Sequence, residues 1–138
     1  MAPAALRTCM ERRAIPEGRE GHRRSRRLLS ACFVLAGVNH FAQPRAYQAI
    51  VPPSLQSRKA EVVVVSGIGE ILGGVGVLLP RTRRASGIAL IVLLAAVFPA
   101  NLYMAREPER FAPIPRWALI ARLPLQPLMM LWAWRATR

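Results

Sequence analysis

One carboxylate, Glu70, stands in the stretch "SGIGEILGG" (66–74) at the centre of an otherwise apolar run that covers residues 60–79. It is the eleventh residue of that run, and no basic residue stands beside it in the sequence. A charged group without a partner costs roughly 2.5–3.5 kcal/mol at the centre of a membrane-inserted helix. A paired or hydrogen-bonded carboxylate there can hold two helices together or exchange a proton with a bound molecule. A partner for Glu70 should therefore lie in one of the other apolar runs.

The partner that the sequence predicts is Arg122, because it is the one Lys or Arg residue inside another apolar run. A guanidinium and a carboxylate in low dielectric stabilise each other, since each alone would be an uncompensated charge. Counting along the helices at 1.5 Å per residue places Glu70 near mid-membrane, with Arg122 and Gln126 between it and the outer surface. The expected polar site contains seven residues, which come from all four runs: Asn39, His40, Glu70, Asn101, Tyr103, Arg122 and Gln126.

These residues must be positioned by four apolar stretches, residues 28–41, 60–79, 85–105 and 117–134. A helix that crosses the hydrocarbon core needs about 20 residues. Residues 85–103, "ASGIALIVLLAAVFPANLY", contain no charge and no polar stripe at the helical period. A helix on the surface of a soluble bundle would show such a stripe. The sequence therefore predicts an all-α protein, a bundle of four transmembrane helices, with a short interfacial helix in the connection at residues 44–56.

Basic residues predict the orientation of this bundle. Residues 1–27 contain eight arginines, and we expect them to form a disordered cytoplasmic leader before a membrane domain at residues 28–138. Together with "RTRR" (81–84) and the last four residues, this side holds thirteen Lys and Arg residues against six on the other. Because Lys and Arg accumulate on the cytoplasmic side, both termini should be cytoplasmic in a multi-pass protein of the inner membrane.

The formal charge of +13 also raises the question of nucleic acid. No aromatic residues alternate with the basic cluster "RRSRR", and no nucleic-acid-binding motif is present. The expected partner is instead the lipid bilayer, to which such a cluster is attracted when the lipids are anionic.

Glycines surround Glu70 in "SGIGEILGG". Gly69 and Gly73 have the GxxxG spacing, which lets a neighbouring helix approach closely, so we interpret them as helix-packing residues. The two cysteines, Cys9 and Cys32, form no CxxC pair, and Met129 and Met130 fit apolar contacts better than metal ligation. The sequence predicts no metal site.

Four segments resemble the successive helices of the DoxX family of small bacterial membrane proteins. The segments are "AGVNHFAQPRAY", "GIGEILGGVGVLLPRTRR", "FPANLYMA" and "RWALIARLPLQPLMMLWAW". The resemblance covers about residues 28–136 and implies a four-helix bundle in the cytoplasmic membrane. It also implies a link to redox chemistry, because the family takes its name from a subunit associated with a thiosulfate:quinone oxidoreductase.

Three functions remain open at this point. The first is a membrane subunit of a quinone-linked oxidoreductase, in which His40, Glu70 and Arg122 bind a quinone and handle protons; other redox subunits or further copies of the chain would be its partners. The second is a small-molecule or proton transporter with a polar pocket, which four helices would form only as an oligomer. The third is a structural or assembly subunit, in which Glu70 and Arg122 only hold the bundle together. Whether the protein is an enzyme is left undecided by the sequence.

Overall fold

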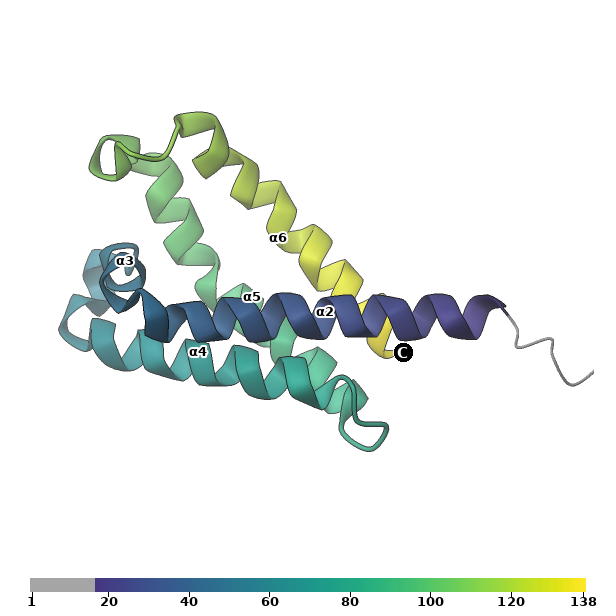
Figure 1. The fold of residues 1–138 in the computed structure, drawn as a ribbon. Helices are drawn as coiled ribbons and strands as arrows, with labels where there is room; N and C mark the ends of the chain where they lie inside the picture. Colours follow the sequence, from purple (N-terminus) through teal and green to yellow (C-terminus); the bar gives the residue numbers. More distant parts are fainter. Residues whose placement is uncertain (1–16) are drawn as a thin grey trace, which may run out of the picture.

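The computed structural model describes residues 17–138, and all regular secondary structure in this range is helical (Figure 1). This confirms the all-α class. In chain order the elements are α2 (Glu17–Ala42), α3 (Pro44–Ala49), η1 (Pro53–Arg58), α4 (Lys59–Gly76), α5 (Arg83–Arg106), η2 (Pro108–Phe111) and α6 (Arg116–Thr137).

The first helix is longer than the apolar pattern predicts. Residues 17–27 were expected to be part of a disordered leader, but they form the first turns of α2. Arginine is a strong helix former, and no proline occurs between Glu17 and Ala42 to interrupt the helix. Residues 1–16 of the expected leader lie outside the described residues. At its other end, α2 stops before Pro44, which begins the short helix α3 where one was expected.

One of the four expected spans, α5, is long and apolar enough to cross a membrane by length and composition. Within its 18 residues α4 contains Lys59, Glu61 and Glu70, and α6 contains Arg122 and Gln126, so polar groups lower the hydropathy of both helices. Four crossings therefore remain a prediction. α4 also ends at Gly76, three residues before the end of the apolar run, and the chain turns through residues 77–82 into α5.

The helices associate as two pairs. α2 packs along α4 to form what we call the first half, and α5 packs along α6 to form the second half. The two halves converge near the C-terminus and the turn at 77–82, and they diverge toward α3 and η2 (Figure 1). We call these the C-terminal end and the α3 end. The main core lies where the halves converge, and it consists of Leu29, Phe33, Val77, Leu90, Ala133 and Ala136.

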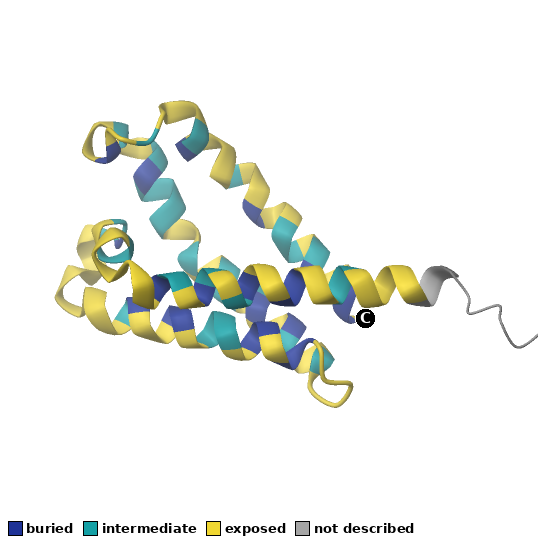
Figure 2. Cartoon of the chain, viewed as in Figure 1, coloured by how far each residue is buried: buried dark blue, intermediate teal, exposed yellow. Residues whose placement is uncertain are grey.

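A smaller core closes the second half at the α3 end, where Met104, Phe111 and Leu119 are buried against one another. Ile50, from the end of α3, packs against this cluster and so joins the first half to the second. Elsewhere much of the helical surface is exposed (Figure 2). Large apolar side chains are among the exposed residues. The divergence of the halves creates the space in which the polar residues lie.

Candidate functional site

Glu70 meets His40 in the interior of the first half. The Nδ1 atom of His40 lies 3.4 Å from Oε2 of Glu70, and both side chains are about nine-tenths buried. The same Nδ1–H donates a hydrogen bond of 2.9 Å to the carbonyl oxygen of Ala36, one turn earlier in α2. Glu70 Oε2 is buried and accepts no hydrogen bond. The carboxylate therefore has an imidazole beside it and an acceptor oxygen left free.

Two glycines bring these side chains together. A Cβ atom on Gly37 of α2 would lie 2.6 Å from the carbonyl oxygen of Gly67 in α4, and one on Gly67 would lie 2.9 Å from Cβ of His40. Any side chain at either position would push the two helices apart. The close approach places the last turns of α2 against the middle of α4, which is where His40 and Glu70 face each other.

The short helix α3 supports the histidine. The chain turns at Pro44, and Tyr47 then stacks on the imidazole of His40 with ring centroids 3.8 Å apart. Asn39 donates a hydrogen bond of 3.0 Å from Nδ2 to the Tyr47 hydroxyl. Asn39 therefore contacts Tyr47, and it holds in place the ring that stacks on His40.

The second half has a polar connection of its own. Asn101 of α5 donates from Nδ2 to Oε1 of Gln126 in α6 over 2.9 Å, and Gln126 donates from Nε2 to the carbonyl oxygen of Leu94. Gln126 is 4% exposed, so these bonds satisfy a buried amide. Pro99 lies between Leu94 and Asn101, but α5 continues through it as one helix. Both hydrogen-bond partners of Gln126 therefore stay on the same helix.

The expected ion pair between Glu70 and Arg122 is not formed. Among the described residues, the basic side chain within 4 Å of the carboxylate is the His40 imidazole, and Arg122 Nη1 instead points to Sδ of Met104 at 3.7 Å. The reason is the arrangement in pairs, since Glu70 belongs to the first half and Arg122 to the second, and the halves diverge at this level. Thioether sulfur is a weak acceptor, so the guanidinium keeps most of its hydrogen-bonding capacity.

Both residues nevertheless line one cavity of about 180 Å³, which lies between the halves. We call it the polar cavity. Four of the seven residues expected at the site line it, together with two further residues that carry a hydroxyl group. The expected ones are His40, Glu70, Asn101 and Arg122, and the additional ones are Ser66 and Tyr47.

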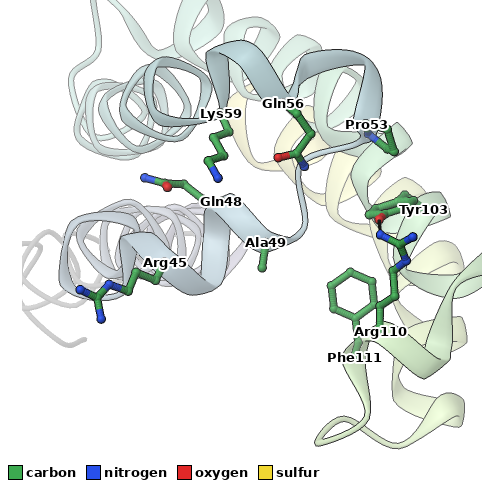
Figure 3. A pocket seen from close by; sticks show the side chains of 9 residues that line it. All are labelled: Arg45, Gln48, Ala49, Pro53, Gln56, Lys59, Tyr103, Arg110 and Phe111. Carbon is green, nitrogen blue, oxygen red and sulfur yellow. Dashed lines mark hydrogen bonds between the residues drawn. The ribbon is translucent and has the colours of Figure 1, made fainter.

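Tyr103, the remaining residue of the expected site, belongs to a different cavity. It lies in a cleft of about 680 Å³ at the α3 end, which we call the end cleft (Figure 3). There its hydroxyl accepts a hydrogen bond of 3.2 Å from Arg110, and its ring meets the edge of Phe111. Lys59 and Gln48 of the first half line the opposite wall. Ala49 and Pro53 line the end cleft while Ile50 and Val51 line the polar cavity, so this short stretch of chain separates the two.

The glycines of α4 divide their contacts between two neighbours. A Cβ on Gly69 would meet the Leu93 side chain at 3.3 Å, and one on Gly73 would collide with Leu90, so these two glycines accommodate leucines of α5. The backbone approach that the GxxxG spacing predicts occurs instead at Gly67 and Gly74, which face α2. Gly69 and Gly73 are thus packing residues, with side chains rather than a backbone against them.

The residues of the polar cavity suit hydrogen bonding better than metal binding. Within residues 17–138 there is no group of three or more His, Cys, Asp or Glu side chains that could hold a metal ion. The cavity combines a free carboxylate oxygen, an imidazole, a guanidinium, an amide and a hydroxyl with the apolar side chains of Val63 and Val97. Such a surface can bind a small molecule with polar atoms at its edge and an apolar body.

Comparison with models of known families gives one match, which covers most of the chain. Residues 29–137 match the model of a family described as a domain of unknown function, DUF8561. The chain belongs to this family. No curated protein and no solved structure matches it.

The DUF8561 match extends from the start of the apolar part of α2 to the end of α6, so it includes every residue that lines the polar cavity. Sequence reasoning missed Tyr47 and Ser66 in that lining. Tyr47 follows Pro44 by three residues, and a proline that ends one helix and begins another can return the next ring to the preceding helix. Ser66 lies one turn before Glu70, which places it on the same face of α4.

Proposed function

We propose that the chain is a four-span integral membrane protein of the bacterial cytoplasmic membrane. The support comes from the surface of its helices. Only 11% of the apolar window of α5 is buried, whereas a core helix of a soluble protein would be mostly buried. Leu35 of α2, Val65 of α4 and Leu128 of α6 are each more than 60% exposed. Acyl chains would cover these side chains.

The likeness to DoxX segments and the distribution of charge support the same placement. The basic residues of α2, of the turn at 77–82 and of the C-terminus lie toward one end of the molecule, which would face the cytoplasm. The α3 end, with the end cleft, would then face the periplasm. The polar cavity would lie in the outer half of the membrane.

Within this frame, we propose that the polar cavity binds the headgroup of a quinone and that the protein serves a quinone-linked oxidoreductase as a membrane subunit. The observation that carries this proposal is Glu70, whose side chain lines the cavity and whose buried Oε2 accepts no hydrogen bond from the described residues. A quinol hydroxyl is a donor that can enter from lipid. Arg122, whose partner among residues 17–138 is the Met104 thioether, can donate to a quinone carbonyl oxygen.

The size of the cavity agrees with a headgroup alone. Its 180 Å³ is below the volume of about 300–1,000 Å³ that is usual for pockets that enclose a whole drug-sized ligand. One substituted ring would occupy it, and an isoprenoid tail would have to lie outside, among the exposed apolar side chains. The protein would supply hydrogen bonds and a proton-accepting carboxylate, and the quinone would supply the redox chemistry.

The test is to purify the full chain in mild detergent, extract it with organic solvent and measure the quinone that copurifies. We expect quinone in the wild type and a loss of at least tenfold in Glu70→Gln, because the amide is a weaker acceptor than the carboxylate. Glu61→Gln is the matched control, since Glu61 is exposed on the same helix. Equal quinone contents in all three proteins, or none in the wild type even after addition of a short-chain quinone, would overturn the proposal.

Transport is the second candidate, and one observation favours it. The end cleft and the polar cavity lie on the same side of the molecule, and residues around Ile50 separate them. Movement of this segment would join them into a path from the α3 end to Glu70. Proteoliposomes test this. A proton gradient should decay faster in vesicles that contain the wild-type protein than in protein-free vesicles. Vesicles that contain the Glu70→Gln variant should lose the gradient no faster than protein-free vesicles. A purely structural role, in which Glu70 and Arg122 only stabilise the bundle, is the third candidate.

A further inference from the structure

A groove at the C-terminal end combines charged and apolar side chains in a way that no feature of the proposed quinone site requires. It has a volume of about 420 Å³ and lies between the start of α5 and the end of α6. Arg84 and Arg138 provide its charge, and Ile88 and Trp134 provide an apolar side. Thr137 also lines the groove, and it packs so closely against Gly87 that a Cβ on Gly87 would collide with it.

The apolar side of this groove is open. Ile88 is 54% exposed and Trp134 is 43% exposed. The guanidinium of Arg138 lies over the Trp134 ring, 4.7 Å from its centroid, so a cation is held at the boundary between the charged and the apolar side. A ligand that covers both sides must have an anionic end and an apolar body.

Positive charge accumulates around the groove. A second cavity of about 200 Å³ shares Arg84, Thr137 and Arg138 with it and adds Arg81 and Arg83. No acidic side chain lines either cavity. Arg83 is also close enough to Arg26 of α2 for the two charges to repel each other. An anion bound here would relieve repulsion among several cations.

We propose that this groove binds one anionic phospholipid, with its phosphate between Arg84 and Arg138 and an acyl chain against Ile88 and Trp134. The inference rests on the proposed membrane location, in which the C-terminal end faces the cytoplasm and lies at the level of the inner-leaflet headgroups. Basic pockets between helices on that side are suited to anionic headgroups. A soluble phosphate would satisfy the arginines and leave the apolar side uncovered.

The test compares phosphatidylglycerol with phosphatidylcholine of the same acyl chains. The full chain is purified in detergent and each lipid is titrated, with bound lipid measured by native mass spectrometry. We expect phosphatidylglycerol to bind the wild type at least tenfold more tightly. In Arg84→Gln/Arg138→Gln this binding should weaken by about thirtyfold, since each basic residue near an anionic surface contributes roughly fivefold. Binding of phosphatidylcholine should not change.

The matched control is Arg58→Gln/Arg116→Gln, which loses the same charge at exposed positions of the α3 end and should keep the preference. Arg84→Lys/Arg138→Lys keeps the charge and should also keep the preference for phosphatidylglycerol. Circular dichroism checks that each variant is helical. Equal binding of both lipids, a preference that survives in the glutamine variant, or displacement of the lipid by equimolar glycerol phosphate would overturn the inference. Recovery of the wild type without detergent would instead overturn the proposed membrane location.

Discussion

At the scale of single residues, the partner of Glu70 is decided by which helix packs against α4 at that position. Both His40 and Arg122 could neutralise a buried carboxylate, and the fixed charge of arginine makes it the natural candidate from sequence. The close approach of Gly37 to Gly67 decides otherwise, because it brings His40 to 3.4 Å. Charge alone cannot reveal which two helices lie in contact.

A double-mutant cycle tests whether His40 and Glu70 act as a pair. We expect His40→Phe and Glu70→Leu each to destabilise the protein by about 0.5–3 kcal/mol, the usual range for a point mutation, because each removes the group that lies 3.4 Å from the other buried polar side chain. The double variant should lose less than the sum, with a coupling of about 0.5–3 kcal/mol. Thermal unfolding in detergent, followed by tryptophan fluorescence, measures all four proteins.

The cycle also separates structure from function. Glu109 is exposed in η2, so His40→Phe and Glu109→Leu should be additive, which controls for indirect effects. A purely structural pair predicts that the double variant regains stability and keeps any bound quinone. A binding site predicts that quinone is lost in both single variants and in the double. Additive losses for His40 and Glu70 would show that the two groups do not interact.

At the scale of the helices, the glycines of the α2–α4 contact should tolerate no side chain. We expect Gly37→Ala and Gly67→Ala to destabilise the protein by about 1–3 kcal/mol, the usual cost of adding a methyl group to a packed contact. Gly21→Ala is the control, because a Cβ there has nothing within 4 Å and alanine favours a helix by about 0.5–1 kcal/mol. The prediction fails if all three variants unfold at the same temperature.

A charge on the exposed face of α5 distinguishes a membrane span from a helix in water. Val92 is 62% exposed near the middle of α5. If α5 spans a membrane, Val92→Lys should make the free energy of insertion less favourable by about 2.5–3.5 kcal/mol. If α5 lies on the surface of a soluble protein, the same change should alter the free energy of unfolding by less than about 0.5 kcal/mol. The amount of protein that remains in carbonate-washed membranes measures insertion. Leu55→Lys, at an exposed position of η1, should leave that amount unchanged.

The sequence predicted the helices better than their contacts. Apolar runs located α4, α5 and α6, and Pro44 located the start of α3, because hydropathy and proline act on local structure. The polar turns of α2 before Leu28 were missed, since helix propensity rather than apolarity forms them. For the site, the run positions of His40, Glu70 and Asn101 indicated a common layer. The partner of Arg122, the role of Tyr47 and the separation of Tyr103 depend on how helices pair, which no local pattern specifies.

At the scale of the whole molecule, the two halves are built alike. Each consists of a long helix, short helical segments that begin at a proline, and a second long helix. Each half also has its own polar connection, His40 with Glu70 in the first and Asn101 with Gln126 in the second. Because these connections lie within the halves, the polar cavity between them is not closed by an ion pair. A ligand there would contact both halves at once.

Four membrane crossings with the basic end in the cytoplasm predict the side of the membrane on which each loop lies. With Cys9 and Cys32 replaced by alanine, single cysteines at Ser57, Arg81, Ala112 and Arg138 sample both ends, and all four positions are exposed. If the chain crosses the membrane four times with its basic end in the cytoplasm, a membrane-impermeant maleimide added to intact cells should label Ser57→Cys and Ala112→Cys. Arg81→Cys and Arg138→Cys should react only after lysis, which also shows that they are competent to react. Labelling of Arg81→Cys in intact cells would reverse the orientation, and equal labelling of Ser57→Cys and Arg81→Cys would exclude α4 as a span.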